Sequence, residues 1–321
     1  MKLKFLFAAS AAVMGCAVAN AQTAPSMTSF IQTVEPGVSS KVSVNLEDNA
    51  SVLYTFEALF ETTAGLTLNA VLAGPDASAF TPTDNYGGIW MMLDENDFTA
   101  VPNGEFMQLD VTLSAGTQCG TITITPTDGC GDEAAEELDP SLRPAPITIT
   151  VVASDYALGT NGYSSFSSAN ATKVTGATAY YVAVDGDVAK LTAVEGNVVP
   201  ANTGVILKGT EGANVTFAPN ADVVAGANEL SASVSGATVS GVHVLATKSG
   251  ETGFYKYTGT EIGAGKAYLE GVTLSRVLFD TETGIENVEL NNIEAIFNLQ
   301  GQKLNETKKG INIVNGKKVM F

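Results

Sequence analysis

Histidine is almost absent from this sequence, and the short motifs of common hydrolases and nucleotide-binding enzymes are missing altogether. The one histidine, His243, lies in an alternating run at 241–246, where Val242 and Val244 point to the opposite face of the strand. A histidine-dependent triad could use only this residue, and we expect it on the outer or polar face of a sheet. No GxSxG, HExxH or P-loop pattern occurs. We therefore predict that the protein is not an enzyme.

Basic residues are also scarce. The chain has 16 Lys and Arg against 34 Asp and Glu, which gives a formal net charge of −18. The imbalance is concentrated in residues 22–152, where 18 acidic and 2 basic residues give −16. Nucleic acids and anionic lipids are bound by clustered Lys and Arg. The composition therefore argues against both as partners.

Long apolar runs are lacking beyond the first 20 residues, and none approaches the roughly 18 residues that a membrane-spanning helix needs. The first 21 residues have the parts of a signal peptide, namely a basic start at Met1–Lys4, an apolar run at Phe5–Ala19 and a small-x-small site at Ala19–Ala21. We predict cleavage after Ala21 and an exported protein, at the cell surface or outside the cell. In the alternative, Cys16 is acylated and holds the protein on a membrane.

Cysteine is limited to Cys119 and Cys130 once the signal peptide is removed. Export would permit a disulfide between them. An extended segment over 119–125 runs about 20 Å, and the remaining steps to Cys130 return at most about 17 Å. The bond therefore closes only if the chain reverses sharply at Pro126–Gly129. The sequence leaves both the bonded and the unbonded state open.

Helical periodicity is nearly absent, whereas short alternating runs bounded by turn residues recur throughout, so we predict an all-β protein. About seven strands in residues 22–152 indicate an immunoglobulin-like β-sandwich. The expected strands are Ser40–Leu46, Leu53–Leu59, Leu66–Leu72, Gly88–Leu93, Glu105–Leu113, Gly120–Thr125 and Ile147–Val152.

A second all-β module is expected at residues 153–280, followed by a polar linker at 281–292. Its clearest hairpin joins Tyr180–Val184 to Val188–Val194 through Asp185–Asp187. Further strands are expected at Val205–Lys208, Val215–Ala218, Val242–Thr247, Gly253–Tyr257 and Lys266–Leu269.

The last segment, residues 293–321, has the pattern of two β-hairpins. Ala295–Leu299 turns at Gln300-Gly301 into Gln302–Leu304, and Ile311–Val314 turns at Asn315-Gly316 into Lys317–Phe321. This unit is too small for a core of its own, so it should dock on, or be handled by, another protein. It could also simply complete the second module.

Four segments of the first domain carry a family resemblance. They read VEPGVSSKVSVNLED, LYTFEALFETTAGLTLNAV, GGIWMMLDEN and NGEFMQLDVTLSAGTQCGTITIT. In this order they resemble the cohesin or cohesin-like sandwich of extracellular bacterial proteins. The similarity is one of pattern, and no binding residue can be transferred from it. A generic immunoglobulin-like or carbohydrate-binding sandwich shows much the same alternation.

The second module and the tail carry another resemblance. The phrases GYSSFSS, VVPANTGVILKG, GFYKYTGTEIGAGKAYL and SRVLF resemble a module found in Bacteroidetes surface proteins, and IFNLQGQKL with KKGINIVNGKKV resembles the C-terminal sorting domain of type IX secretion. The resemblance implies a surface address and contact between the tail and the secretion machinery. Asn312 stands where an aromatic residue is common, and no Lys or Arg follows Val319. A sorting signal and a closing hairpin therefore both stay open.

A metal site could be built in the acidic loop that follows Thr127. Calcium accepts six to eight oxygen ligands, and Asp128, Asp132, Glu133 and Glu136 lie close together in the sequence. The EF-hand order of ligands is missing, and the alternative is an exposed loop with hydrated charges. Calcium is the one cofactor that the sequence suggests.

Four aromatic residues are candidates for a binding surface. Tyr86 and Trp90 flank the Gly87-Gly88 turn of the first domain, and Tyr255 and Tyr257 share one face of a strand in the second. Exposed flat rings could stack on a sugar or anchor a protein partner. The alternative is that these rings belong to the core.

Together these features predict a non-catalytic exported or surface protein that recognises an extracellular protein or a carbohydrate. One alternative is a structural subunit of a surface assembly, in which exposed strand edges pair with neighbouring molecules. Another is a secreted glycosidase or peptidase. A glycosidase would require a cleft with two facing carboxylates.

Overall fold

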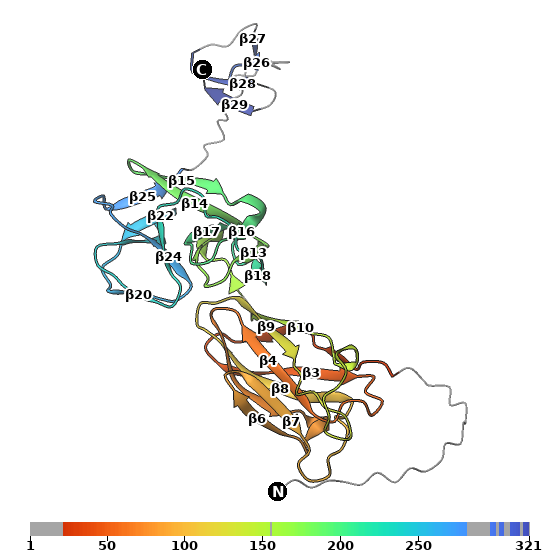
Figure 1. Cartoon of the computed structure of the whole chain (residues 1–321). Coiled ribbons are helices and arrows are strands. Elements are labelled where there is room, and N and C mark those ends of the chain that lie inside the picture. The colour runs from red at the N-terminus through yellow and green to blue at the C-terminus, as the bar shows by residue number, and fades with distance from the viewer. Residues whose placement is uncertain are drawn as a thin grey trace, which may run out of the picture. The chain divides into compact units, whose positions relative to one another are not determined.

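The computed structural model describes residues 22–154, 156–280, 296–299, 302–304, 309–314 and 317–320 (Figure 1). The predicted signal peptide with Cys16, the linker at 281–292 and both predicted turns of the tail lie outside these residues. The chain divides into two compact units, Met1–Ser154 and Asp155–Phe321. None of the helices in the described ranges has the length and apolar composition to cross a membrane.

The first unit is built almost wholly of strands, as the sequence predicts. They are β1 (Ser26–Thr28), β2 (Gln32–Val34), β3 (Ser39–Glu47), β4 (Phe56–Thr62), β5 (Leu66–Ala73), β6 (Thr81–Tyr86), β7 (Ile89–Leu93), β8 (Gly104–Leu113), β9 (Cys119–Pro126) and β10 (Ile147–Ala153). Two short 3₁₀ helices, η1 (Pro75–Ala77) and η2 (Pro140–Leu142), lie between strands.

These strands form two sheets (Figure 1). The β3–β8 sheet has the order β1-β3-β8-β5, and the β4–β9 sheet has the order β2-β10-β9-β4-β7-β6. All seven predicted strands are present, whereas β1, β2 and β6 were not predicted. Strands β1 and β2 have three residues each, too few for alternation to show, and β6 contains a proline and polar residues on an edge.

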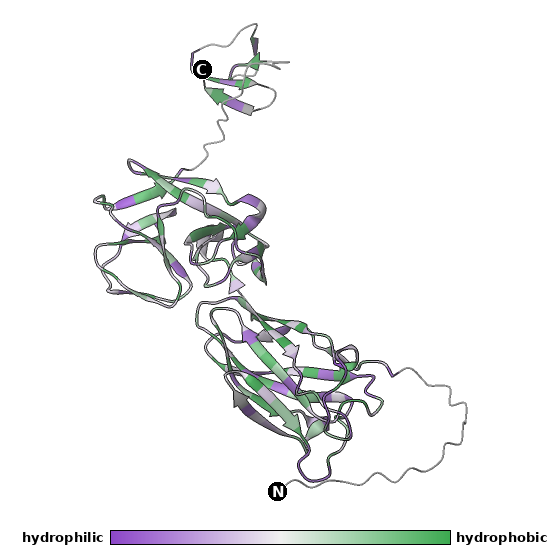
Figure 2. Cartoon of the chain, viewed as in Figure 1, coloured by the Kyte–Doolittle hydropathy of each residue, from purple (hydrophilic) through white to green (hydrophobic). Residues whose placement is uncertain are grey.

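The core of the first unit lies between the two sheets and follows the two-residue alternation of the strands. Val42, Val44 and Leu46 of β3 point into it, as do the apolar residues that alternate along β4 and β9. Figure 2 shows hydrophobic residues concentrated along the strands. A bulge opposite Val44 and Asn45 lets Phe106 and Met107 both be buried, and Phe106 meets Phe56 edge to face with ring centroids 5.2 Å apart.

Asn49 organises the loops at one end of this sandwich and is itself only 8% exposed. Its side-chain amide donates to the carbonyls of Leu53 (3.0 Å) and Val101 (2.6 Å). Its side-chain oxygen accepts from the N–H groups of Val52 and Leu53, both at 3.0 Å. One buried side chain thus satisfies four backbone groups from two loops.

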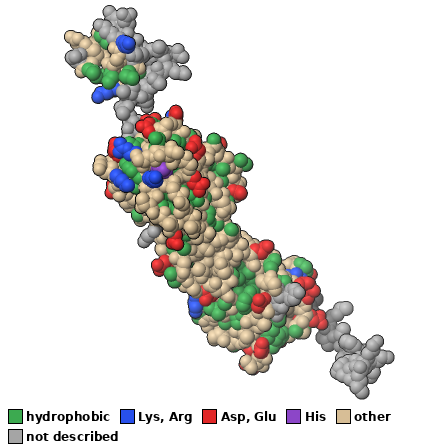
Figure 3. All heavy atoms as spheres, turned by 90° about the vertical axis from the view of Figure 1, so that its left-hand side faces the viewer, with side chains coloured by type: hydrophobic (Ala, Val, Ile, Leu, Met, Phe, Trp, Pro, Cys, Tyr) green, Lys and Arg blue, Asp and Glu red, His purple; other side chains and the backbone are tan. Residues whose placement is uncertain are grey.

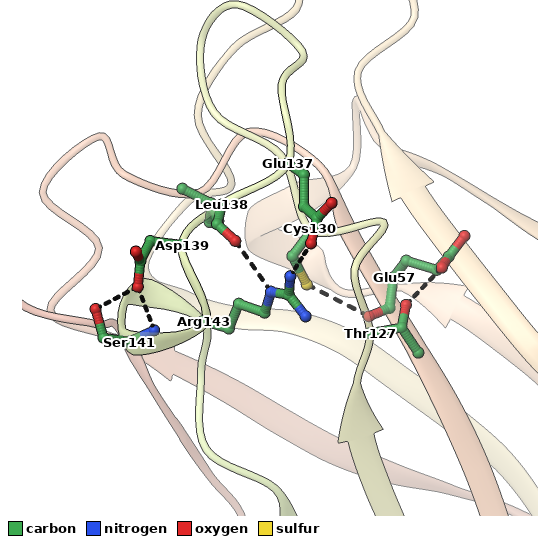
Figure 4. Close-up of polar contacts among 8 residues, drawn as sticks. All are labelled: Glu57, Thr127, Cys130, Glu137, Leu138, Asp139, Ser141 and Arg143. Carbon is green, nitrogen blue, oxygen red and sulfur yellow. Dashed lines mark hydrogen bonds and ion pairs between the residues drawn. The ribbon is translucent and has the colours of Figure 1, made fainter.

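Arg143 holds the acidic loop that follows β9 (Figure 4). Its Nε donates to the carbonyl of Leu138 at 3.1 Å, and its guanidinium forms an ion pair with Glu137. The carboxylate of Asp139 accepts from the N–H (2.8 Å) and the hydroxyl (2.6 Å) of Ser141, with the backbone bond capping η2. No other Lys or Arg occurs between Lys41 and Lys173, so this loop depends on a single cation.

The second unit is again nearly all β. Its strands are β11 (Tyr156–Ala157), β12 (Tyr163–Phe166), β13 (Thr172–Thr175), β14 (Thr178–Asp185), β15 (Val188–Ala193), β16 (Val198–Val199), β17 (Val205–Lys208), β18 (Asn214–Pro219), β19 (Leu230–Ser233), β20 (Ala237–Thr238), β21 (His243–Lys248), β22 (Glu251–Lys256), β23 (Glu261–Ile262), β24 (Lys266–Leu269) and β25 (Arg276–Phe279). The 3₁₀ helices are η3 (Thr160–Gly162) and η4 (Glu195–Asn197).

A nine-stranded sheet with the order β12-β17-β14-β15-β25-β22-β21-β24-β19 dominates this unit. A smaller sheet has the order β11-β18-β13-β16, and β20 pairs with β23. The predicted hairpin of β14 and β15 is present, and the other five predicted strands correspond to β17, β18, β21, β22 and β24. Tyr156 packs edge to face on Phe217 at 5.2 Å, and burial raises the pKa of its hydroxyl to about 12.

The described part of the tail contains β26 (Ile296–Phe297), β27 (Lys303–Leu304), β28 (Ile311–Val314) and β29 (Lys317–Met320). They pair antiparallel in the order β27-β26-β28-β29, so the strands of both predicted hairpins are paired. Asn312, the residue that departs from the sorting pattern, is buried and donates to the carbonyl of Gly310 at 3.0 Å. Its amide is thereby accommodated where an aromatic ring was expected.

We predict that Asn49→Ala lowers the free energy of unfolding by about 3 kcal/mol, because it leaves buried backbone groups without partners. Urea unfolding of the purified chain, followed by the fluorescence of Trp90 in the first unit, measures this change. Asn69→Ala is the matched control, since Asn69 is exposed and bonds only surface side chains, and it should cost less than about 1 kcal/mol. Equal losses in the two variants would show that Asn49 has no special role.

We also predict that Arg143→Met loosens the acidic loop without unfolding the sandwich, since methionine keeps the apolar stem and loses every hydrogen bond. Backbone amides in residues 132–142 should exchange with solvent at least tenfold faster, measured by hydrogen–deuterium exchange. Lys41→Met, which removes the other cation of residues 22–152, should leave these amides unchanged. Unaltered exchange in Arg143→Met would contradict this role.

Candidate functional site

The outer face of the β4–β9 sheet carries an apolar cluster. Leu59 of β4 pairs with Ile89 of β7, and Met91 lies opposite Glu57 in the same ladder. Phe56 and Met92 form an alternate pair of this ladder and are buried in the core. The remaining pairs must therefore point outward.

We name this surface the β4–β7 face and define it by Leu59, Ile89, Met91 and Leu93. All four side chains are half-buried and neither fully exposed nor part of the core. Figure 3 shows hydrophobic side chains gathered on one face of the first unit, with acidic side chains around them. Contiguous apolar side chains on an outer sheet face are typical of interaction surfaces.

Threonine rows flank the β4–β7 face on both sides. Outward positions of neighbouring strands carry Thr121, Thr123 and Thr125 of β9, Thr148 and Thr150 of β10, and Thr81 and Thr83 of β6. The hydroxyls of Thr123 and Thr148 lie 3.2 Å apart across the ladder. The face is therefore an apolar centre within a hydroxyl-rich rim, an arrangement common in protein interfaces.

The charge on this sheet is entirely negative. Glu57 and Glu61 point outward from β4, and none of the six strands contains Lys or Arg. The Glu57 carboxylate accepts a hydrogen bond from the hydroxyl of Thr127 at 2.5 Å, which fixes it beside Met91 (Figure 4). A partner that buries this face must therefore supply positive charge or leave these carboxylates hydrated.

The outer face of the β3–β8 sheet is different, because its polar side chains bond one another. Asp110 accepts from Asn69 at 3.0 Å and from the hydroxyl of Ser39 at 2.5 Å, and these bonds, that of Asn69 first, hold its pKa below the usual range. Ser43 and Gln108 both donate to Glu105. Hydrogen bonds within this face therefore satisfy much of its polar surface.

Of the four aromatic residues predicted to bind, two lie in each unit. Trp90 pairs with Ala58 on the inward side of the ladder and packs partly against the core. The backbone of Tyr86 ends β6, and its side chain lies outside the described part. Tyr255 is only 6% exposed, so its ring is not available for stacking. Tyr257 is half-buried and donates to the carbonyl of Glu261 at 2.9 Å.

The predicted calcium ligands do not converge. Asp132 uses its carboxylate to accept from the N–H groups of Ala134 (2.8 Å) and Glu136 (3.0 Å). Asp128, Glu133 and Glu136 are exposed. Across the described ranges, no group of three or more His, Cys, Asp or Glu side chains is placed to hold a metal ion.

His243 does not lie on an outer polar face, and that prediction was wrong. The side chain is 1% exposed, and its Nε2 lies 2.7 Å from the carbonyl oxygen of Leu274, which fixes the proton on Nε2. Its Nδ1 is buried with no partner among the described residues. The alternation of side chains places His243 on the opposite face of the strand from Val242, as expected, but both residues are buried, so neither face is exposed at this point. No hydroxyl or thiol bonds this imidazole within the described residues, so they contain no catalytic triad.

No disulfide joins Cys119 and Cys130. Cys119 begins β9, and Cys130 follows the turn beyond the other end of the same strand. After that turn the chain bridges to Thr55 and does not return along β9. Burial raises the pKa of the Cys130 thiol, whose Sγ donates to the carbonyl of Glu57 at 3.4 Å (Figure 4).

The residues of the β4–β7 face were not among the predicted site residues, although the sequence carried a signal for them. The run Ile-Trp-Met-Met-Leu at 89–93 is apolar at every position, so both faces of that strand are apolar. Such a run is typical of a strand that is covered on both sides. In the first unit the core covers one of these sides.

No protein-family model matches this chain, and no curated protein sequence matches it. Several cohesins are among the solved structures that match. A type I cohesin–dockerin complex from Clostridium thermocellum matches at 13% identity, covering 40% of this chain and 100% of that chain, with a TM-score of 0.33. The sixth cohesin of scaffoldin B from Acetivibrio cellulolyticus, in complex with a dockerin, matches at 20% identity, covering 41% and 99%, with a TM-score of 0.32. A non-cellulosomal cohesin from Archaeoglobus fulgidus matches at 13% identity, covering 40% and 92%, with a TM-score of 0.30.

Proposed function

We propose that this protein is a non-catalytic recognition protein that binds another protein through the β4–β7 face. The observation that carries the proposal is the cluster of Leu59, Ile89, Met91 and Leu93 on the outer side of a sheet whose inner side already forms the core. Removing such side chains from water contributes roughly 25 cal/mol per Å² of apolar area, from which the entropic cost of association is subtracted.

The chemistry of the face favours a protein over a carbohydrate. Sugar recognition relies on flat aromatic rings exposed together, and the one tryptophan, Trp90, packs toward the core. Aliphatic and thioether side chains instead suit the apolar side chains of a protein, and methionine adapts to their shapes. Threonine hydroxyls around the centre can bond polar groups at the rim of such an interface.

The partner should present a basic rim around an apolar centre. Glu57 and Glu61 flank the face, and residues 22–152 have a net charge of −16. Opposite charge accelerates association and selects among partners, and salt weakens both effects. We place this recognition at the cell surface or outside the cell, with export through residues 1–21 and a surface address in residues 293–321.

The test uses the mature chain, Gln22–Phe321, to capture a partner from secreted and surface proteins of the source organism, followed by calorimetric titration of the purified pair. Leu59→Lys with Met91→Lys should weaken binding at least 100-fold, because two side chains at the centre are replaced by charges that must be desolvated. Thr67→Lys with Gln108→Lys adds the same charge to the β3–β8 sheet and should change the dissociation constant less than threefold. The association rate of the wild type should fall between 50 and 500 mM NaCl.

Equal binding by both double variants would refute the proposal, since the partner would then use another surface. A protein that captures only glycans would refute it as well. Sedimentation of the chain alone tests the structural-subunit alternative: self-association abolished by Leu59→Lys with Met91→Lys would assign the face to assembly with further copies.

A further inference from the structure

The nine-stranded sheet of the second unit curls until strands from its two ends meet. Strand β12 lies at one end of the strand order, and β24 lies next to the other end. After β12, the N–H of Ser167 donates to the carbonyl of Gly265 at 3.1 Å, and the Ser167 hydroxyl donates to the carbonyl of Lys266 at 2.8 Å. The curled sheet is thus closed at this point.

Away from this link, one edge of β21 is open. β21 pairs with β22 along its whole length but with β24 only at His243 and Val244. The N–H of Tyr257 donates to the carbonyl of Val242 at 2.9 Å, so the backbone groups of Val242 face β22. Every second residue of a strand bonds to the same side, and the backbone groups of Val244 and Ala246 therefore face β22 as well. Leu245 and Thr247 therefore bond the other way. The Leu245 N–H completes the pairing with β24, because Val244 and Tyr268 form a non-hydrogen-bonded pair, and the backbone groups of Thr247 lie beyond the end of this pairing.

The edge of β12 that does not face β17 is only partly open. The N–H of Gly209 donates to the carbonyl of Gly162 at 2.9 Å, so the backbone groups of Ser164, two residues later, bond to β17. The backbone groups of Tyr163 and Ser165 point away from β17. The Tyr163 N–H donates to the carbonyl of Thr160, and the Ser165 carbonyl accepts from the Tyr156 hydroxyl at 3.4 Å. The Tyr163 carbonyl and the Ser165 N–H have no partner in the described part of the chain.

Both open edges line one cavity of about 410 Å³, which we call the β12–β21 slot. Its walls include Tyr163, Ser165, Leu245 and Thr247. Asn161 bridges to the hydroxyl of Thr252 at 2.9 Å, which ties the loop before β12 to β22, and the Ser167 link ties the chain after β12 to β24. Between these two links, the four residues of β12 span about 13 Å at about 3.3 Å per residue.

We propose that the β12–β21 slot binds an extended peptide segment of about four residues as an additional strand between β12 and β21. A peptide offers alternating N–H and C=O groups to both sides at a repeat of about 6.6 Å, which is the spacing between the outward groups of Leu245 and Thr247. A sugar has hydroxyls but no such repeat.

Lys266 and Glu261 are the two charged residues that line this cavity, and Lys266 is the one that can attract an acidic side chain of the peptide. The only described contact of Lys266 with another side chain is the ring of Tyr156, 6.0 Å from Nζ. No ion pair to Lys266 occurs among the described residues. An acidic side chain on the peptide would supply the missing partner. This inference concerns the second unit and stands independently of the function proposed for the first.

A library of random heptapeptides displayed on phage, selected against the mature chain, supplies the probes. Selected sequences should carry Asp or Glu at one recurrent position. The synthetic peptides, acetylated and amidated at their ends, should slow amide exchange at Ser165 and Thr247 at least tenfold. Ala246 is the internal control, since its amide already bonds β22 and should change little.

Thr247→Pro tests the strand geometry, because it removes one N–H that points into the slot and has no partner within the described structure. It should weaken peptide binding at least tenfold. Thr247→Val is the matched control, since both variants lose the hydroxyl that lies 2.8 Å from Thr252 and only proline loses the N–H. Valine should change affinity less than threefold, and Lys266→Met should weaken acidic peptides selectively.

Circular dichroism checks that Thr247→Pro is folded. If it is not, N-methylation of the peptide amides against the wild-type chain removes the same hydrogen bonds and should abolish binding. A library without binders, or peptides that bind Thr247→Pro and Thr247→Val equally, would overturn the proposal. A glycan that protects the amides of Ser165 and Thr247 would overturn it too, by assigning the slot to a sugar.

Discussion

Backbone hydrogen bonding between strands is the constraint on which both units of this protein depend. An all-β chain must pair or hydrate every strand N–H and C=O, and buried groups left unpaired are costly. In the first unit the order of strands satisfies this need across two sheets, and Asn49 satisfies it where the loops are buried. In the second unit the pairing of β21 with β24 stops after two residues, and a cavity lies beside the open edge. A place where pairing ends is therefore a place where another chain can continue it.

The two-residue alternation of side chains decides what each sheet presents outward, and this part could be predicted from the sequence. Alternation gave the strands β3, β8 and β9 to within one residue at each end, and it also gave the hairpin of β14 and β15. It failed for β1 and β2, which have too few residues to show a period. The sequence also indicates the β4–β7 face, because every position from Ile89 to Leu93 is apolar and both faces of that strand must then be apolar.

What alternation cannot supply is which faces are covered, and this explains the errors at the predicted sites. Tyr255 and Tyr257 were predicted to share a face, but Lys248 lies over the Tyr255 ring at 4.8 Å and the ring is buried. His243 was expected outside because its valine neighbours point the other way, yet the carbonyl of Leu274 reaches it from a segment 31 residues later. Both outcomes depend on contacts between distant segments. The same holds for the β12–β21 slot, whose two edges are brought together only by the curling of the whole sheet.

Charge separates the two binding surfaces. Arg143, one of two basic residues in 22–152, is engaged with Glu137 and the Leu138 carbonyl, so it does not neutralise the carboxylates beside the β4–β7 face. In the second unit, Lys266 lines the slot without an ion pair among the described residues. The first surface should therefore select a basic partner and the second an acidic peptide. Because like charges placed face to face oppose binding, neither ligand should compete for the other surface. A single chain could then hold two chemically different partners at once.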